Sequence, residues 1–288
     1  MKSVLFVILQ YITPQQLLSR IVGWFANTRI ECIKKTFIGW FIKRYQVDMS
    51  IAANSDPNSY PNFNTFFTRP LAVGQRPISD DTNQIICPAD GAISQINHIE
   101  GGRIFQAKGH CFTLEELLGG SSKLAKPFHN GLFTTIYLSP KDYHRVHMPC
   151  AGSLTTMIHI PGKLFSVNGD TTAKVPRLFA RNERVAALFD TEIGPMAVVM
   201  VGAMIVAGIE MVWAGQVTPI KDRIRTIYYG NTQSTITLKK GEEMGRFMLG
   251  STVILLFPKE SVVWRQSLCA QSPVVMGQHL GAIVQENV

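Results

Sequence analysis

Large apolar side chains recur at helical spacing near the start of the chain and in short, dense runs further along. Between residues 14 and 41 they follow one another every three or four positions in two stretches, which predicts two amphipathic helices. Thr13-Pro14 precedes the first helix and is typical of an N-cap followed by proline at the first helical position. Residues 50–61 are rich in Asn, Ser, Asp and Pro, which predicts a linker.

Beyond the linker, short apolar runs alternate with Gly and Pro, a pattern that predicts strands. The runs cover residues 132–138, 154–160, 185–189, 196–201, 205–212, 235–238 and 252–257. Glu192-Ile193-Gly194-Pro195 separates two of them and predicts a hairpin turn. Helical patterning returns only locally, at 113–118, with Thr113 as the expected N-cap. The pattern predicts an α+β fold, in which a strand-rich barrel or sandwich at 50–288 follows a helical region at 1–49.

The N-terminal helices combine apolar and basic side chains with Trp24 and Trp40. The apolar run at 4–9 is too short for a signal peptide or a membrane-spanning helix. Residues 1–47 hold seven Lys or Arg and one Glu, so that +6 of the net charge of +8 lies there. Cations with Trp and Phe on short amphipathic helices are typical of an anchor lying in the membrane surface. The alternative is a pair of helices packed on the main domain, with solvated cations.

The composition excludes several classes of protein. With 46% hydrophobic and 17% charged residues, the chain has enough apolar surface to fold, which excludes disorder. Five widely spaced cysteines without a C-x-x-C pair argue against a disulfide framework and a zinc ribbon. Neither G-x-G-x-x-G nor the P-loop motif occurs. Because the basic residues lie on hydrophobic helices, a lipid surface suits them better than a nucleic acid.

Reactive side chains concentrate at three places. Asp90 lies in a Pro/Gly turn, His144 and His147 lie in a segment rich in charged residues, and Ser251 follows Gly250 just before an apolar run. Each place also has a purely structural interpretation. The Asp can form a turn, the histidines can be surface residues or a metal-binding pair, and the Gly-Ser dipeptide can begin a strand.

Together with other segments, these places form a set of motifs that resembles the phosphatidylserine decarboxylase family, whose members are pyruvoyl-dependent enzymes. The resemblance covers nearly the whole chain. Its motifs are Phe63-Asn-Thr-Phe-Phe-Thr-Arg-Pro-Leu71, Pro88-Ala-Asp-Gly91, Lys108-Gly-His110, Tyr143-His-Arg-Val-His-Met-Pro149, Leu164-Phe-Ser-Val-Asn168, Phe179-Ala-Arg-Asn-Glu-Arg184 and Leu249-Gly-Ser-Thr252. The last motif is the most specific, because the family cuts its own chain there.

The resemblance implies that the chain is a proenzyme. Ser251 would attack the carbonyl carbon of Gly250 to form an ester, and elimination would then split the chain. Hydrolysis of the resulting dehydroalanine would release ammonia and leave a pyruvoyl group on an α chain of residues 251–288, beside a β chain of residues 1–250. A serine hydroxyl needs a base. The resemblance assigns His147 as that base and Asp90 as its partner, in an Asp90–His147–Ser251 triad.

The resemblance also implies the reaction. The pyruvoyl group derived from Ser251 would form a Schiff base with the amine of phosphatidylserine and accept electrons as CO₂ leaves, giving phosphatidylethanolamine. We expect His144 to donate the proton that replaces CO₂, with Tyr143 or water as alternatives. Because the substrate is a membrane lipid, we expect peripheral attachment to the cytoplasmic face of a bacterial cell membrane. The expected partners are this lipid and the α and β chains of a heterodimer. Further homo-oligomerisation stays open, and neither nucleic acid nor metal is expected.

Two other classes remain open from the sequence alone. A membrane-associated serine hydrolase would use the same triad on external esters without self-cleavage, but it lacks the G-x-S-x-G nucleophile elbow. In a non-catalytic membrane-binding module, the histidines and Ser251 would be structural. Both alternatives predict one intact chain. A metal site at His144 and His147 is a minor further option.

Overall fold

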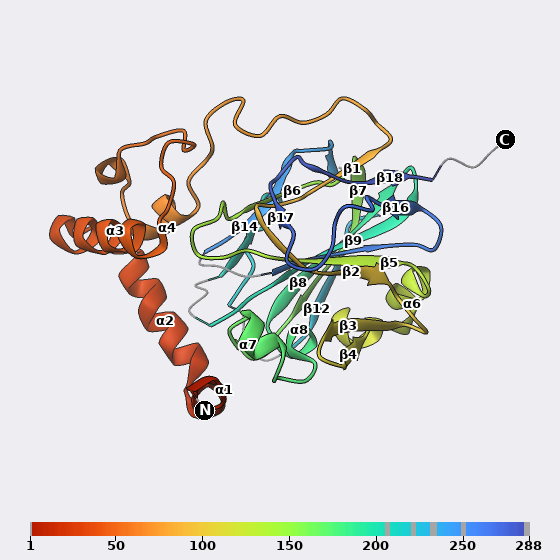
Figure 1. The fold of residues 1–288 in the computed structure, drawn as a ribbon, viewed down its shortest axis with the longest axis horizontal. Helices are drawn as coiled ribbons and strands as arrows, with labels where there is room; N and C mark the ends of the chain where they lie inside the picture. The colour runs from red at the N-terminus through yellow and green to blue at the C-terminus, as the bar shows by residue number, and fades with distance from the viewer. Residues whose placement is uncertain (1, 205–207, 220–222, 231–234, 249–251, 285–288) are drawn as a thin grey trace.

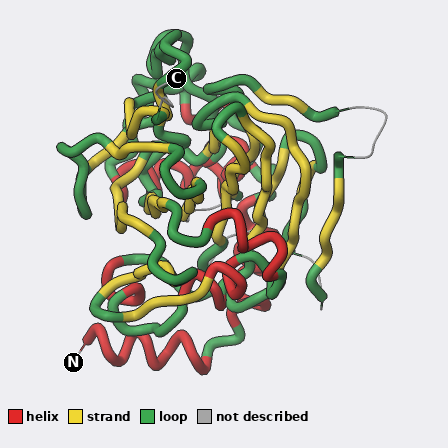
Figure 2. Tube along the Cα trace, turned by 90° about the vertical axis from the view of Figure 1, so that its right-hand side faces the viewer, coloured by secondary structure: helices red, strands yellow, loops and turns green. Residues whose placement is uncertain are grey.

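The structure is a computed structural model that describes residues 2–204, 208–219, 223–230, 235–248 and 252–284. Three helices begin the chain and form an arm beside a body built mainly of strands (Figure 1). They are α1 (Lys2–Ile12), α2 (Gln15–Ala26) and α3 (Glu31–Tyr45). In the view turned by 90°, α1 lies along one edge of the body (Figure 2).

The largest sheet has nine strands among the described residues, and its neighbouring strands are antiparallel. In spatial order it consists of β12 (Arg225–Tyr228), β7 (Gly152–Ile160), β8 (Arg184–Thr191), β9 (Gly194–Val201), β15 (Thr252–Phe257), β5 (Leu132–Tyr137), β2 (Gly91–His98) and β17 (Pro273–Val274), with β13 (Thr237–Leu238) also paired to β7. Strand β15 lies between β9 and β5. All of its residues are buried, as a continuous apolar run predicts for a strand inside a core.

Two smaller sheets cover one face of this central sheet. One consists of β11 (Gly215–Gln216), β10 (Ile209–Met211), β14 (Glu243–Phe247) and β6 (Arg145–His147), and the other of β1 (Gln84–Ile86), β18 (His279–Ile283) and β16 (Val262–Trp264). Their apolar side chains meet those of the central sheet in one core, which includes Val146, Phe189, Phe247, Val253 and Leu280. The body is therefore layered like a sandwich.

Short elements cover the opposite face of the central sheet. They are β3 (Arg103–Ala107), β4 (His110–Thr113), α5 (Leu114–Leu117), α6 (Ser122–Ala125), η2 (Lys126–Phe128), α7 (Gly169–Thr172) and α8 (Leu178–Arg181). A second core lies beneath them, with Leu117, Phe128 and Phe179 packed near Leu256. The predicted cap of the 113–118 helix is confirmed, because Thr113 and Glu116 form a reciprocal capping box.

The observed strands agree with most of the predicted ones. The runs at 132–138, 154–160, 185–189, 196–201 and 252–257 correspond to β5, β7, β8, β9 and β15. Of the run at 205–212, the described strand β10 covers only Ile209–Met211, and residues 205–207 lie outside the described residues. At the coarse level the predicted fold class is confirmed, since the structure is rich in strands, with several sheets and a few helices.

The predicted start of α2 is wrong. The helix begins at Gln15 with Pro14 in the N-cap position, and the Thr13 hydroxyl instead donates a hydrogen bond to the carbonyl oxygen of Leu9 at 2.7 Å. The difference arises from the preceding helix α1, which the sequence pattern does not predict. Both the backbone N–H and the hydroxyl of Thr13 donate to the carbonyl oxygen of Leu9 in the last turn of that helix, so the hydroxyl does not cap α2.

One face of α3 packs on the rest of the molecule through η1 (Pro57–Ser59) and α4 (Phe63–Phe67). The cluster there contains Ala26, Ile38, Phe41, Val47, Tyr60, Phe63, Phe66 and Phe67. Lys34, one of the seven basic residues within 1–47, is buried, and its Nζ lies 3.0 Å from the carbonyl oxygen of Tyr60 and 2.7 Å from Oε1 of Glu31. By contrast, Trp24 is 68% and Trp40 52% exposed. Within the described ranges, no helix has the length and apolar character needed to cross a membrane.

Candidate active site

The candidate site lies at one end of the central sheet. Tyr137, the last residue of β5, pairs with both Ala92 in β2 and Thr252 in β15. Asp90 immediately precedes β2, so it lies at the same sheet end as the start of β15. Gly250 and Ser251 lie outside the described residues. The first described residue after them, Thr252, is fully buried, and its hydroxyl has no hydrogen-bond partner among the described residues.

Asp90 is held rigidly in the turn before β2. Its side chain is buried and accepts hydrogen bonds from Nε of Arg76 at 3.0 Å, from Nη2 of Arg76, and from the backbone N–H of Met276 at 2.8 Å. The next residue, Gly91, cannot be replaced without movement, because a Cβ there would clash with the carbonyl oxygen of Tyr137. The turn is therefore fixed both by the Asp90 side chain and by close backbone packing.

His147 lies in β6 with both ring nitrogens engaged. Nδ1 is 2.8 Å from the carbonyl oxygen of Gly241, and Nε2 is 2.9 Å from the hydroxyl of Tyr143. A carbonyl oxygen only accepts, so Nδ1 carries the proton and the Nε2 lone pair accepts from Tyr143. Burial lowers the pKa of His147, although the Gly241 contact and nearby acidic groups work in the opposite direction.

His144 lies just before β6 and is fully buried against the ring of Phe67, at a centroid distance of 4.0 Å. Its Nδ1 donates to the carbonyl oxygen of Asp142 at 2.7 Å, while its Nε2 is buried with no hydrogen-bond partner. Burial lowers the pKa of His144 to about 3. The ring is therefore neutral near pH 7, with an unpaired acceptor nitrogen.

The structure brings the three described site residues into one region without linking them directly. The N–H of His147 donates to the carbonyl oxygen of Pro88 at 2.8 Å, which places β6 against the turn that carries Asp90. The N–H of Phe247 donates to the carbonyl oxygen of His144 at 3.0 Å, which joins the end of β14 to the same region. Within the described part of the chain, no hydrogen bond joins Asp90 to His147.

The interpretation of the histidines as surface residues is wrong, because His144 and His147 are both buried. His144 lies in a loop and His147 in strand β6. Two partners of the site have no recognisable signal in the sequence. Arg76 pairs with Asp90 from 14 positions away, and the carbonyl oxygen of Gly241 orients His147 from 94 positions away.

Comparisons with known proteins identify the family. A sequence profile described as phosphatidylserine decarboxylase matches residues 63–282, and a second, described as PSD, matches residues 5–46. A phosphatidylserine decarboxylase proenzyme of Pseudomonas putida is 59% identical over 286 residues, which is 99% of this chain and 100% of the relative. Proenzymes of the same name from Pseudomonas fluorescens and Ectopseudomonas mendocina are each 57% identical, over 100% and 98% of this chain and 100% and 99% of the relatives.

These matches identify the chain as a decarboxylase that is made as a proenzyme. The chain belongs to the phosphatidylserine decarboxylase family. The predicted family and the predicted enzyme class, a carboxy-lyase made as a proenzyme, are confirmed. Membership also favours the decarboxylase over the serine hydrolase and the non-catalytic membrane module.

Proposed function

We propose that this chain converts phosphatidylserine to phosphatidylethanolamine and CO₂ after cutting itself between Gly250 and Ser251. The strongest support is the match to proenzymes of this name along 99% of the chain, together with its Leu249-Gly-Ser-Thr252 motif. Intact mass spectrometry of the purified protein tests the proposal. It should find two chains, 1–250 and 251–288, the second lacking a free amino terminus. A single unmodified chain of wild-type sequence contradicts it.

For self-cleavage, His147 is suited to act as the base for the Ser251 hydroxyl. Burial lowers the pKa of His147, so the ring is neutral and Nε2 carries the lone pair that a base needs. The negative charge of Asp90 raises the same pKa and helps the ring to hold that proton. In this Asp90–His147–Ser251 triad, Asp90 acts electrostatically rather than through a hydrogen bond.

The surroundings fit a pyruvoyl group derived from Ser251. Two buried polar atoms in this region, Oγ1 of Thr252 and Nε2 of His144, have no partner and could meet an additional polar group. Such a group supplies an electrophilic carbonyl that accepts the electrons released by decarboxylation. The residues present therefore suit the cofactor that the family implies.

His144 is then the candidate for moving the proton. Its neutral ring carries the only N–H on Nδ1, which is committed to the Asp142 carbonyl oxygen. Nε2 accordingly has to take up a proton before it can deliver one in place of CO₂. Tyr143 is less suited to this role, because its hydroxyl is already committed to His147 and burial raises its pKa.

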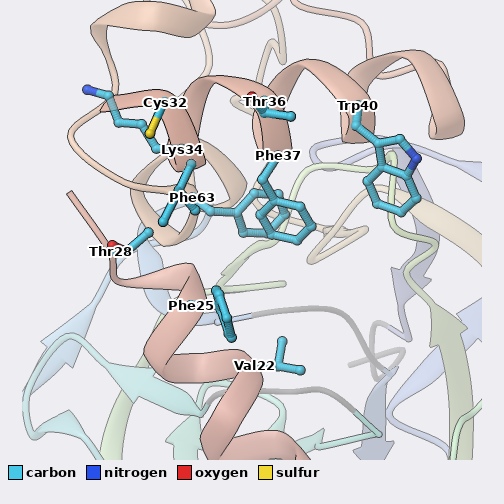
Figure 3. Close-up of a pocket in the computed structure, with 10 residues that line it drawn as sticks. Val22, Phe25, Thr28, Cys32, Lys34, Thr36, Phe37, Trp40 and Phe63 are labelled. Atoms are coloured by element: carbon cyan, nitrogen blue, oxygen red, sulfur yellow. The ribbon is translucent and has the colours of Figure 1, made fainter. Parts of the chain in front are cut away.

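The N-terminal region, residues 1–49, is proposed to attach the catalytic region, residues 50–288, to the membrane. Large apolar side chains are exposed along α1 to α3, including Ile12, Leu17, Trp24, Phe25 and Trp40. A cavity of about 740 Å³ between α2, α3 and α4 has a mainly apolar lining, in which Val22 and Phe25 of α2 face Phe37 and Phe63 (Figure 3). An apolar surface of this extent is suited to lipid rather than water.

We propose peripheral attachment on the cytoplasmic face of the cell membrane, with the α and β chains together as the working unit. Extraction of membranes tests the attachment. Because apolar burial persists when charges are screened, high salt should release only part of the protein, and detergent should release the rest. Complete release by salt alone contradicts insertion of the exposed aromatic side chains.

A further inference from the structure

A polar cavity of about 330 Å³ lies at the elbow between α1 and α2, where the arm meets the body. Its lining consists of Gln10, Tyr11, Thr13, Pro14, Gln15, Gln16 and Leu17 from the arm, and Lys163, Phe165 and Arg181 from the body. It shares no residue with the candidate active site. Phe67, which contacts His144, packs instead on α3, beyond the other end of α2 (Figure 1).

The elbow is fastened to the body by specific contacts, so the cavity is a built feature. Gln15 Oε1 accepts from the N–H of Leu164 at 2.7 Å, and Gln10 Oε1 accepts from the N–H of Ser166 at 2.8 Å. Gln15 Nε2 in turn donates to the carbonyl oxygen of Gln10 at 2.7 Å. Two buried amide side chains of the arm thus satisfy backbone groups of the body.

Aromatic and cationic side chains complete one wall. The rings of Tyr11 and Phe165 lie 4.9 Å apart, and the Arg181 guanidinium lies 4.9 Å from the centroid of Phe165. Arg181 Nη1 donates to the Tyr11 hydroxyl at 3.1 Å. The backbone N–H of Lys163 donates to the carbonyl oxygen of Arg181 at 2.8 Å, and both residues line the cavity.

The cavity has hydrogen-bond donors and positive charge but no negatively charged side chain to balance that charge. No carboxylate lines it, and within the described residues neither Lys163 nor Arg181 forms an ion pair. Gln10 is 2% exposed, yet its Nε2 has no hydrogen-bond partner in the part of the chain that the structure describes. A buried amide donor and two cations that lack an ion pair within the described residues suit an anionic ligand with several oxygen acceptors, such as a phosphodiester.

The surface around the cavity indicates which kind of molecule carries the phosphodiester. Leu9, Ile12, Leu17 and Ile21, on the two helices that form the elbow, are 47%, 73%, 56% and 47% exposed. A cationic cavity beside exposed apolar side chains matches a lipid, whose charged head and hydrocarbon chains are joined.

We propose that the elbow cavity binds the phosphodiester head of an anionic membrane phospholipid that is not the substrate. This inference rests on the proposed membrane attachment. The bound head would fix the angle of the arm and so orient the active site toward the bilayer.

Sedimentation with vesicles tests the proposal, using the full-length, self-cleaved protein. The vesicles contain phosphatidylcholine alone or phosphatidylcholine with phosphatidylglycerol, an anionic lipid that is not decarboxylated. Lys163→Gln removes one exposed cation of the cavity, and the matched control Arg20→Gln removes one exposed cation of α2 outside it. We expect Lys163→Gln to weaken phosphatidylglycerol-dependent binding by about tenfold or more, as for a lost charge-assisted hydrogen bond. Arg20→Gln should cost about fivefold or less, as for a cation near a charged surface.

Equal losses for the two variants overturn the proposal, because they indicate diffuse attraction rather than a site. A second variant, Arg181→Lys, keeps the charge but removes the planar group that contacts Tyr11 and Phe165. It should weaken binding in the same direction, whereas a diffuse effect leaves binding unchanged. If inorganic phosphate stabilises the protein while vesicle binding does not depend on phosphatidylglycerol, the cavity is a free-anion site and the proposal is wrong. If the proposed membrane attachment is itself wrong, the wild type binds neither kind of vesicle. That result differs from a failure of the cavity proposal alone, in which the wild type still binds vesicles.

Discussion

The Tyr143 hydroxyl donates a hydrogen bond to Nε2 of His147 at 2.9 Å and thereby occupies the one ring nitrogen that can act as a base. The other nitrogen is committed to the carbonyl oxygen of Gly241. Burial raises the pKa of Tyr143, so its hydroxyl keeps its proton and remains a donor near neutral pH. The Ser251 hydroxyl therefore competes with Tyr143 for Nε2 if it is to be deprotonated directly by His147.

Replacing Tyr143 by Phe tests this competition. The variant leaves Nε2 of His147 without a partner, so we expect self-cleavage at least as fast as in the wild type. The measurement is a time course of newly synthesised protein on a denaturing gel, following the appearance of chains 1–250 and 251–288. A folded Tyr143→Phe protein that does not cleave would show instead that Tyr143 relays the proton from Ser251 to His147.

His144 should be required for turnover but not for self-cleavage. Its Nε2 is buried and has no hydrogen-bond partner among the described residues, whereas His147 is the base that we propose for cleavage. We expect His144→Ala to be processed into two chains and to lose turnover by about 10²–10⁴-fold, the usual contribution of a general acid–base group. His144→Asn is the matched control, because its amide can still donate to the Asp142 carbonyl oxygen. An uncleaved His144→Asn protein would contradict the separation of the two roles.

The same residue predicts how stability depends on pH. Burial holds the pKa of His144 at about 3, below its ordinary value of 6.5, so the unfolded chain binds the extra proton first as the pH falls. The neutral ring thus favours the folded state above about pH 6.5, and this contribution is lost progressively toward about pH 3. Unfolding in urea at several pH values should show the wild type losing more stability than His144→Asn between about pH 7 and about pH 4. Parallel pH profiles would contradict the assignment.

Five strands of the central sheet could be predicted from the sequence because their signals are local, whereas the order of the strands could not. The runs that form β5, β7, β8, β9 and β15 are short, apolar and flanked by turn residues. Runs of this kind are typical of strands buried in a core. Helix α1 could not be predicted from periodicity, because residues 4–9 form a continuous apolar run without helical spacing. Its tether to the body, from Gln10 to Ser166, joins positions 156 residues apart and leaves no local signature.

The candidate site divides in the same way. Asp90, His144 and His147 were found through motifs, but their environment depends on distant segments. The carbonyl oxygen of Gly241, which sets the tautomer of His147, lies 94 positions away in the chain, and its backbone group is common to all residues. No pattern of residue types predicts such a contact, nor the burial that makes His144 neutral.

Asp90 is predicted to contribute to stability as well as to self-cleavage. Its carboxylate pairs with Arg76, and both side chains are largely buried, so an amide at this position leaves the Arg76 charge unpaired. We expect Asp90→Asn to lower the free energy of unfolding by about 3 kcal/mol. Cleavage should also slow, because the charge that raises the pKa of His147 is gone. Arg76→Lys, which keeps the charge, is the control for cleavage. Normal cleavage of a folded Asp90→Asn protein would remove Asp90 from the triad.

The α chain should stay bound after the cut without any covalent link. Strand β15 is inserted between β5 and β9, β17 pairs with β2, and β18 pairs with β1, so residues after 251 are part of two sheets. The N–H of Met276 also donates to Asp90 across the two chains. We expect both chains to elute as one particle in native buffer, at the same volume as the uncleaved control Ser251→Ala.

Thermal unfolding gives the sharper test of the same point. The midpoint of the cleaved protein should rise with protein concentration, because its unfolding separates two chains, whereas that of Ser251→Ala should not. If the 1–250 chain remained folded and soluble after the shorter chain had been lost, the pairing of β15 with β5 and β9 would not be what holds the sheet together.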